Sequence, residues 1–403
     1  MRILFIPLGL STHYLHLVPL AWACRSAGHE VRIAGQQHAF AAIEQSGMTV
    51  TPVGERYDFV EHWKEALTEL GRLIEATGGH RAGTERTPEE RRRLIQLRSD
   101  PFLKSAEAML EDLVPLARSW QPDLIVADPL VLAAPLLAET VSVPLVHHLW
   151  APEVNDKVGF GGVRGGGLPW PDDLRRLFES YGLEPQGRYS TAVVDPCPES
   201  LQAPGIPGRM PIRYVPYNGP GTAPAWLAEP PARPRVCVTW GSTHTEMVGT
   251  HNFLVPEILA GLEKLDVETV VVVRGADRAL VEPAASPERV RIVEGLPLHA
   301  LLPTCDAIIH QCGSGTMLTA AALGVPQVLM PTTVDRAEIS RMVADTGAGI
   351  VADTSDTAAE TLRPVFEHAL SDTAVRESAD RLSREIAAQP SPAAVAASLD
   401  KLL

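Results

Sequence analysis

The stretch that decides the fold lies at the start of the chain, where residues 2–34 read RILFIPLGLSTHYLHLVPLAWACRSAGHEVRIA. Its opening RILFI is mostly apolar, as in a buried strand, and a turn with Pro, Gly and Ser follows. Apolar residues at helical spacing come next and stop at Gly28, after which VRIA forms a second short strand pattern. Strand, helix and strand in this order predict a parallel βαβ unit.

The same rhythm begins again far downstream. The strand pattern RVCVTW at residues 235–240 is followed by Gly241, Ser242 and a helical pattern over residues 253–264. Further strand patterns come after it, at residues 269–274, 290–293, 307–309 and 327–330. Residues 216–234 lie between the two halves and are dense in Pro, Gly and Ala, which is typical of an interdomain linker.

These patterns predict an α/β fold with two Rossmann-like, doubly wound parallel-sheet domains that face each other across a cleft. The expected parts are an N-terminal domain of residues 1–215, a linker of residues 216–234, a C-terminal domain of residues 235–385, and a helix over residues 386–403 that packs back on the N-terminal domain. Ligands of such sheets bind beyond the carboxyl ends of the strands, so the loops after the strands are expected to line the cleft.

Composition limits the partners and the compartment. The 403-residue chain carries 35 Lys and Arg against 49 Asp and Glu, a formal net charge of −14. Such a chain is not expected to bind nucleic acid or an anionic membrane, so an anionic ligand must be held locally by backbone amides and a few side chains. The five cysteines form no CxxC pair, which argues against a disulfide scaffold and a metal site. Because there is no signal-peptide pattern and no apolar run of about 18 residues, we expect a cytoplasmic protein.

The most informative motif is AIIHQCGSGT at residues 307–316, a strand pattern that feeds a turn of small residues and then a helical pattern. Backbone amides at the start of that helix, together with the positive end of its dipole, would make an anion site. The spacing matches neither the dinucleotide fingerprint nor the P-loop. A tight packing turn without a ligand is the alternative for the same residues.

Several further motifs occur in order along nearly the whole chain. In the second half these are PLHALLPTCD at residues 297–306, running into HQCGSGT at 310–316, then Val325-Pro326, and Asp335 ahead of GAG at 347–349. In the first half they are THY at 12–14, VPLAW at 18–22 and AGHEV at 27–31. In this combination the chain resembles the family 1 glycosyltransferases of the GT-B fold, particularly the bacterial enzymes that attach deoxysugars to macrolides and other polyketide antibiotics.

The resemblance implies an inverting glycosyltransferase that moves a deoxysugar from a dTDP-sugar to a polyketide or other natural-product aglycone. It implies that His13 is the general base for the acceptor hydroxyl and that Asp128, after the apolar residues 124–127, orients it. A carboxylate on one ring nitrogen fixes the tautomer and stabilises the imidazolium. No Asp-x-Asp motif occurs, so we expect no metal, and no cofactor apart from the nucleotide sugar that serves as substrate.

The resemblance places the donor in the C-terminal domain. The residues expected to bind the nucleotide, the diphosphate or the sugar are Thr239, Gly241, Ser242, Leu296, Pro297, Leu298, His310, Gly313, Ser314, Gly315, Thr316, Asp335 and Arg336. Among them, His310 would donate a hydrogen bond to a phosphate oxygen. Arg336 stands where relatives that use common hexoses often have Gln, which favours a sugar with fewer hydroxyl groups. Cys312 replaces a glycine that is common in the family turn, so the backbone there is less free to adopt positive φ.

The acceptor is expected in the N-terminal domain. Polar and aromatic residues that would line its pocket are His16, Trp63, His147, His148, Trp150 and Trp170. The implied partners are the small-molecule aglycone and the nucleotide sugar, while a homodimer and an activator protein shaped like a cytochrome P450 stay open. Two other functions are compatible with the fold. A sugar-nucleotide epimerase would not need His13 beside Asp128, and a non-catalytic helper protein would keep only the donor fold.

Overall fold

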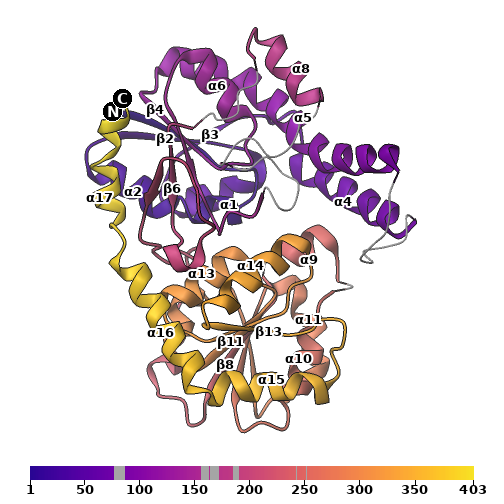
Figure 1. Ribbon diagram of the computed structural model, residues 1–403. Coiled ribbons are helices and arrows are strands. Elements are labelled where there is room, and N and C mark those ends of the chain that lie inside the picture. Colours follow the sequence, from indigo (N-terminus) through magenta and orange to yellow (C-terminus); the bar gives the residue numbers. More distant parts are fainter. Residues whose placement is uncertain (77–86, 156–162, 164–171, 185–189, 242, 251) are drawn as a thin grey trace.

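A computed structural model describes residues 1–76, 87–155, 163, 172–184, 190–241, 243–250 and 252–403. The chain forms two lobes, each built on one sheet in which all paired neighbours are parallel (Figure 1). The strand orders are β3-β2-β1-β4-β5-β6-β7 in the N-terminal lobe and β10-β9-β8-β11-β12-β13 in the C-terminal lobe. The prediction of two Rossmann-like parallel-sheet domains is therefore confirmed.

The elements of the N-terminal lobe have the following bounds. Its strands are β1 (Arg2–Ile6), β2 (Glu30–Gly35), β3 (Val50–Pro52), β4 (Leu124–Ala127), β5 (Leu145–His148), β6 (Ala192–Asp195) and β7 (Arg209–Pro211). Its helices are α1 (Thr12–Leu15), α2 (Val18–Ser26), α3 (Phe40–Gln45), α4 (Phe59–Ala76), α5 (Pro88–Trp120), α6 (Ala133–Val141) and α8 (Asp172–Ser180), with the 3-10 turns η1 (Gln37–Ala39) and η2 (Glu199–Leu201).

The second half of the chain repeats the alternation. Its strands are β8 (Arg235–Thr239), β9 (Glu268–Val273), β10 (Val290–Glu294), β11 (Ala307–His310), β12 (Gln327–Leu329) and β13 (Gly349–Val351). Its α-helices are α9 (Thr243–Val248), α10 (Val255–Leu262), α11 (Arg278–Val281), α12 (Leu298–Leu301), α13 (Ser314–Ala322), α14 (Val334–Asp345), α15 (Ala359–Ser371), α16 (Thr373–Ala388) and α17 (Pro392–Ala396). The 3-10 turns are η3 (Ala225–Ala228), η4 (Gly275–Asp277), η5 (Glu282–Ala284), η6 (Leu302–Thr304) and η7 (Leu399–Leu402).

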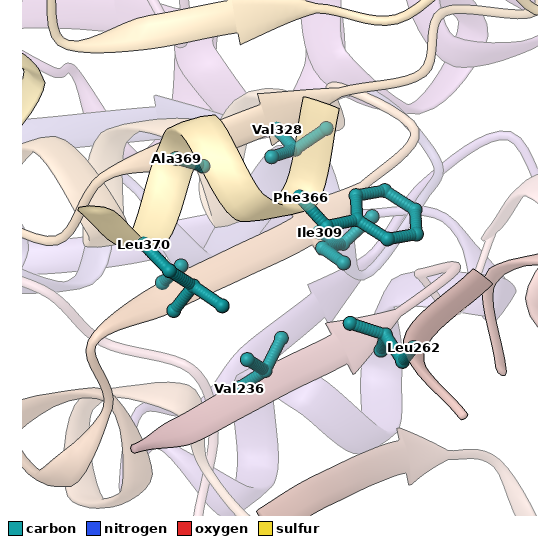
Figure 2. A pocket seen from close by; sticks show the side chains of 8 residues that line it. Val236, Leu262, Ile309, Val328, Phe366, Ala369 and Leu370 are labelled. Carbon is teal, nitrogen blue, oxygen red and sulfur yellow. The ribbon is translucent and has the colours of Figure 1, made fainter. Parts of the chain in front are cut away.

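Both sheets are buried on their two faces, as parallel sheets require. In β1, Leu4 belongs to one core cluster of the N-terminal lobe, while its neighbour Phe5 points to the other face and belongs to a second cluster. In the C-terminal lobe, Val236 and Ile309 from β8 and β11 meet Leu262 of α10 and Phe366 of α15 (Figure 2). The small gap among these side chains has only apolar lining, so it belongs to the core.

In both sheets the strand order reverses at one point, between β1 and β4 and between β8 and β11. Parallel register pairs Ile6 with Ala127 in the first sheet and Thr239 with His310 in the second, so the carboxyl ends of these strands lie level. The loops that follow such a pair of strands diverge and leave a crevice in which α/β proteins bind ligands. The fold thus directs attention to the residues directly after β1, β4, β8 and β11.

The chain passes between the lobes twice. In the first passage, residues 216–234, Trp226 packs on the C-terminal lobe, with the guanidinium groups of Arg235 and Arg291 5.2 and 4.5 Å from its ring. In the second, α16 packs against α13, and α17 then packs against α2 of the N-terminal lobe with Val395 and Ala396 buried. Among the described residues, no helix is long and apolar enough to span a membrane.

Candidate active site

A histidine and an aspartate meet where the strand order of the N-terminal lobe reverses. His13 lies in α1, after the loop that follows β1, and Asp128 directly follows β4. Nδ1 of His13 is 2.7 Å from Oδ2 of Asp128; the carboxylate is fully buried, and the histidine side chain is 15% exposed. Oδ1 of Asp128 accepts a hydrogen bond of 2.8 Å from the amide of Leu130. Because an ionised carboxylate only accepts, Nδ1 carries the proton and Nε2 presents a lone pair.

Three more histidines and a tryptophan surround this pair. The ring of Trp150 meets His13 edge to face, with centroids 5.0 Å apart. The rings of His16 and His148 are also 5.0 Å apart, and Nδ1 of His148 donates a hydrogen bond of 2.8 Å to the carbonyl of Leu149. His147 is the preceding residue of β5 and is buried. The structure thus brings His16, His147, His148 and Trp150 to one end of the sheet.

These three histidines are neutral at neutral pH. Burial lowers the pKa of His147 and that of His148 to about 4, although the negative charge of Asp128 opposes the shift in both. Burial lowers the pKa of His16 well below its ordinary value, and the nearby His148 and His13 lower it further. These three histidines therefore add no positive charge beside Asp128.

Two other predicted acceptor residues lie elsewhere or outside the described part. Trp63 of α4 packs between Phe59 and Phe102, with ring centroids 5.3 Å from each, at the junction of α4 with α5. Its ring is partly buried in the core of the lobe. Trp170 falls outside the described residues, as does the predicted donor residue Ser242.

His310 ends β11 and is fully buried, and the structure corrects its predicted role. Its Nε2 lies 3.0 Å from Oε1 of Gln327, and its Nδ1 accepts a hydrogen bond of 3.1 Å from the amide of Cys312. Burial lowers the pKa of His310 to about 4, so the ring is neutral and Nε2 carries its one proton. Both nitrogens are therefore engaged within the protein, and none is left to donate to a phosphate. The ring instead holds the turn that follows it.

That turn contains a backbone conformation that is rare for residues other than glycine. Cys312 has φ of 62° and is buried. A side chain at such a φ costs about 1–2 kcal/mol. The hydrogen bond from its amide to His310 and the burial of its thiol offset that cost. Cys312 was expected to make positive φ less accessible at this position, but the chain adopts the left-handed conformation there.

The turn leads into α13, whose first amides are available to a ligand. Gly313 is the N-cap and no side chain caps the helix. The amides of Ser314, Gly315 and Thr316 have no partner within the helix, because the first turn of any α-helix lacks acceptors for them. Gly315 is exposed, and no heavy atom lies within 4 Å of the position where its Cβ would be. The first turn of α13 therefore offers amides next to open space, which suits an anion.

Gln311 connects the two loops at this reversal point, and the sequence did not single it out. Its buried side chain lies beside Gly241, where an added Cβ would come within 2.2 Å of Nε2, and its Oε1 is 3.4 Å from the amide of Gly313. Gly241 has φ of 77°, and its amide is 3.4 Å from Oγ1 of Thr239, which donates to the carbonyl of Val272 at 3.0 Å. The only sequence signal for Gln311 is its position between the end of a strand and a turn that contains glycine.

Asp335 and Arg336 lie in the first turn of α14. Burial lowers the pKa of Arg336, while the negative charge of Asp335 opposes the shift. Burial is the main cause of the lowered pKa of His310, and the positive charge of Arg336 lowers it further. Burial lowers the pKa of Arg98 in α5, and the negative charge of Asp335 partly opposes this shift. Arg98 comes from the other lobe and was not predicted.

The predicted base-binding residues follow β10. Leu296 is buried, and Pro297 and Leu298 begin α12 beside the interlobe passage. An added Cβ at Gly221 would come within 2.3 Å of Pro297, so the passage presses closely on this loop. Asn218 accepts a hydrogen bond of 2.9 Å from the amide of His299. Across the described residues, no three His, Cys, Asp or Glu side chains lie together in a way that could hold a metal ion.

Comparison with known proteins assigns the chain to a family. Residues 22–241 match the model of the erythromycin biosynthesis protein CIII-like N-terminal domain, and residues 256–402 match that of the C-terminal domain. The chain belongs to the erythromycin biosynthesis protein CIII-like family. This confirms the resemblance to the family 1 antibiotic glycosyltransferases, and the chain is a nucleotide-sugar-dependent glycosyltransferase.

Named relatives are similar to this chain over nearly their whole length. It is 34% identical to tylactone mycaminosyltransferase of Streptomyces fradiae, over all of this chain and 92% of the relative. It is equally identical to 10-deoxymethynolide desosaminyltransferase of Streptomyces venezuelae, over all of this chain and 97% of the relative. Among solved structures, spinosyn rhamnosyltransferase SpnG matches with a TM-score of 0.80 and 30% identity, over 99% of this chain and 100% of the other. SpnG has also been solved with thymidine diphosphate and with the spinosyn aglycone.

Proposed function

We propose that this protein transfers a deoxysugar, with inversion, from a dTDP-sugar to a polyketide or other natural-product aglycone, and that His13 is the general base. The observation that carries the proposal is the 2.7 Å contact between His13 and the fully buried Asp128 at the reversal point of the first sheet. It leaves a lone pair on Nε2 of a side chain that retains some exposure, as proton abstraction from an acceptor requires.

The chemistry follows from these atoms. Nε2 of His13 takes the proton of the acceptor hydroxyl as its oxygen attacks the anomeric carbon, and the bond from that carbon to the diphosphate breaks. Asp128 stabilises the imidazolium formed, and a positioned base of this kind contributes about 10²–10⁴-fold. A single displacement with attack opposite the leaving group inverts the anomeric configuration. Because no enzyme nucleophile takes part, the mechanism has no covalent intermediate.

The departing diphosphate needs positive charge. The free amides of Ser314, Gly315 and Thr316 supply it by hydrogen bonds, and the positive charge of Arg336, which also acts on His310, adds to it. In this proposal His310 acts indirectly, because it holds the amide of Cys312 and thereby the course of the chain into α13. Asp335 is then placed to accept hydrogen bonds from sugar hydroxyl groups at the start of α14.

The comparisons favour transfer over the alternative functions. The relatives described above are named as transferases of mycaminose and desosamine to macrolactones, and a structural neighbour binds thymidine diphosphate. Because His16, His147 and His148 are neutral, they provide no positive charge for a second nucleotide sugar, which favours an uncharged aglycone. An epimerase would also have no use for the His13–Asp128 pair.

The test is the variant His13→Ala. We expect the turnover number for sugar transfer to fall by about 10²–10⁴-fold while the Kd for dTDP, measured by calorimetry, is unchanged. His368→Ala is the matched control, because that side chain lies on the exposed surface of α15, and we expect it to keep wild-type turnover. Transfer by His13→Ala at the wild-type rate would show that the base is assigned wrongly. NMR coupling constants of the product, compared with those of the donor, test inversion directly.

A further inference from the structure

Helix α9 follows β8 of the C-terminal lobe, yet it contacts the N-terminal lobe. Its Met247 is 8% exposed and belongs to the core cluster of the N-terminal lobe that includes Phe59 and Phe102. Accordingly α9 contacts α4, and Figure 1 shows it on the side of its lobe nearest that helix. A methionine fills irregular apolar gaps well, which makes it a suitable anchor between two separately folded surfaces.

A second contact joins the two lobes at the start of the same helix. The hydroxyl groups of Thr12 and Thr243 share a hydrogen bond of 3.2 Å. Thr12 is the residue before His13, and Thr243 is two residues after Gly241, whose loop follows β8. The bond therefore links the segment that carries the base to the segment that closes the donor side of the reversal point.

On its other side α9 is tied to its own lobe. Glu246 accepts a hydrogen bond of 3.4 Å from Arg274, which directly follows β9. Arg274 is itself held by Asp277, with nitrogen–oxygen distances of 3.0 and 3.2 Å. The helix is thus attached to the N-terminal lobe through Thr243 and Met247 and to the C-terminal lobe through Glu246.

We propose that Thr12 and Thr243 are positioning residues for sugar transfer, whose hydrogen bond, supported by Met247, fixes the distance between His13 and the donor-binding loop after β8. Transfer requires the attacking oxygen and the anomeric carbon to approach to within about 3–3.5 Å, and the two are held by different lobes. A hydrogen bond between the two lobes, in the segments that carry His13 and the loop after β8, restricts the movement of the lobes relative to each other and so favours that approach. The kinetic part of this proposal rests on the function proposed above.

The test is a double-mutant cycle with Thr12→Val and Thr243→Val, which remove each hydroxyl and keep the side-chain shape. We expect each single variant to lower the turnover number about two- to tenfold, as loss of one hydrogen bond between neutral groups predicts, and the double variant to be no slower than the slower single one. Thr12→Ser and Thr243→Ser should keep wild-type turnover. The Kd for dTDP should change by less than about twofold. Thr68→Val, on the exposed face of α4, is the matched control and should behave as wild type.

A structural readout separates this proposal from the assignment of the base. In Thr12→Val, amide hydrogen exchange of residues 243–248 should accelerate about two- to tenfold, although the substitution is in the other lobe. Met247→Ala should accelerate the same amides. These measurements need no turnover, so they hold even if His13→Ala proves active. Exchange in α9 that is unchanged by Thr12→Val, or turnover losses that multiply in the double variant, would overturn the proposal.

Discussion

Acidification provides a direct test of the role that the structure gives to His310. Burial lowers its pKa from 6.5 to about 4, so the folded protein binds this proton less readily than the unfolded chain does. Protonation of His310 therefore does not change the folding stability above pH 6.5, and it lowers the stability progressively as the pH falls from there towards 4. Each pH unit in this window costs about 1.4 kcal/mol, which gives about 2 kcal/mol for His310 at pH 5.

The assay compares urea unfolding at pH 7 and pH 5 for the wild type and His310→Gln. A glutamine oxygen can still accept from the amide of Cys312, but the side chain cannot take up a proton. We expect the variant to lose about 2 kcal/mol less than the wild type between the two pH values, a difference in midpoint of about 0.7 M at an m-value of about 3 kcal/mol/M. His368→Gln, on the exposed surface of α15, should keep the wild-type pH dependence. Equal losses in His310→Gln and wild type would show that His310 is not held neutral.

Three further substitutions test the remaining geometry. Asp128→Asn keeps an acceptor for the Leu130 amide but can present an amide N–H to His13. We therefore expect the turnover number to fall about 10²–10⁴-fold while the Kd for dTDP is unchanged. An Asp128→Asn variant with wild-type turnover would contradict the orienting role of Asp128. Gly241→Ala should weaken dTDP binding in calorimetry because its Cβ displaces Gln311, whereas Gly28→Ala, also at positive φ but in open space, should not; equal affinities would refute this. The free energy of unfolding of Cys312→Gly should be about 1 kcal/mol higher than that of Cys312→Ala, because both variants lack the thiol and only alanine keeps the left-handed strain.

The fold could be predicted because its signals are local. The apolar run at 290–293 is observed as β10, Val290–Glu294, and the helical pattern at 253–264 as α10, Val255–Leu262. In a parallel sheet each strand is buried on both faces, so a short apolar run between turns identifies it without knowledge of its neighbours. The strand ends then locate the loops that carry His13, Asp128 and the turn before α13.

The roles of individual side chains depend on contacts that a local pattern does not contain. His310 could be placed at a strand end, but its ring is engaged by Gln327, the first residue of β12, which pairs with Ile308. The sequence separates the histidine and the glutamine by 17 residues and gives no sign of that pairing. Arg98 of α5 is influenced by the charge of Asp335 in the other lobe, an interaction between residues far apart in the sequence that no local pattern indicates.

The net charge of −14 and the proposed binding of a diphosphate are compatible because they act over different ranges. At physiological ionic strength the Debye length is about 8 Å, so exposed carboxylates farther than this from the site contribute little repulsion. Backbone amides act on a bound anion at hydrogen-bond distance, where screening is weakest. The first turn of α13 carries no acidic side chain, and the carboxylate at the other reversal point, Asp128, is paired with His13. In the proposed mechanism each lobe supplies one half of the displacement, with the base in the N-terminal lobe and the amides that receive the diphosphate in the C-terminal lobe.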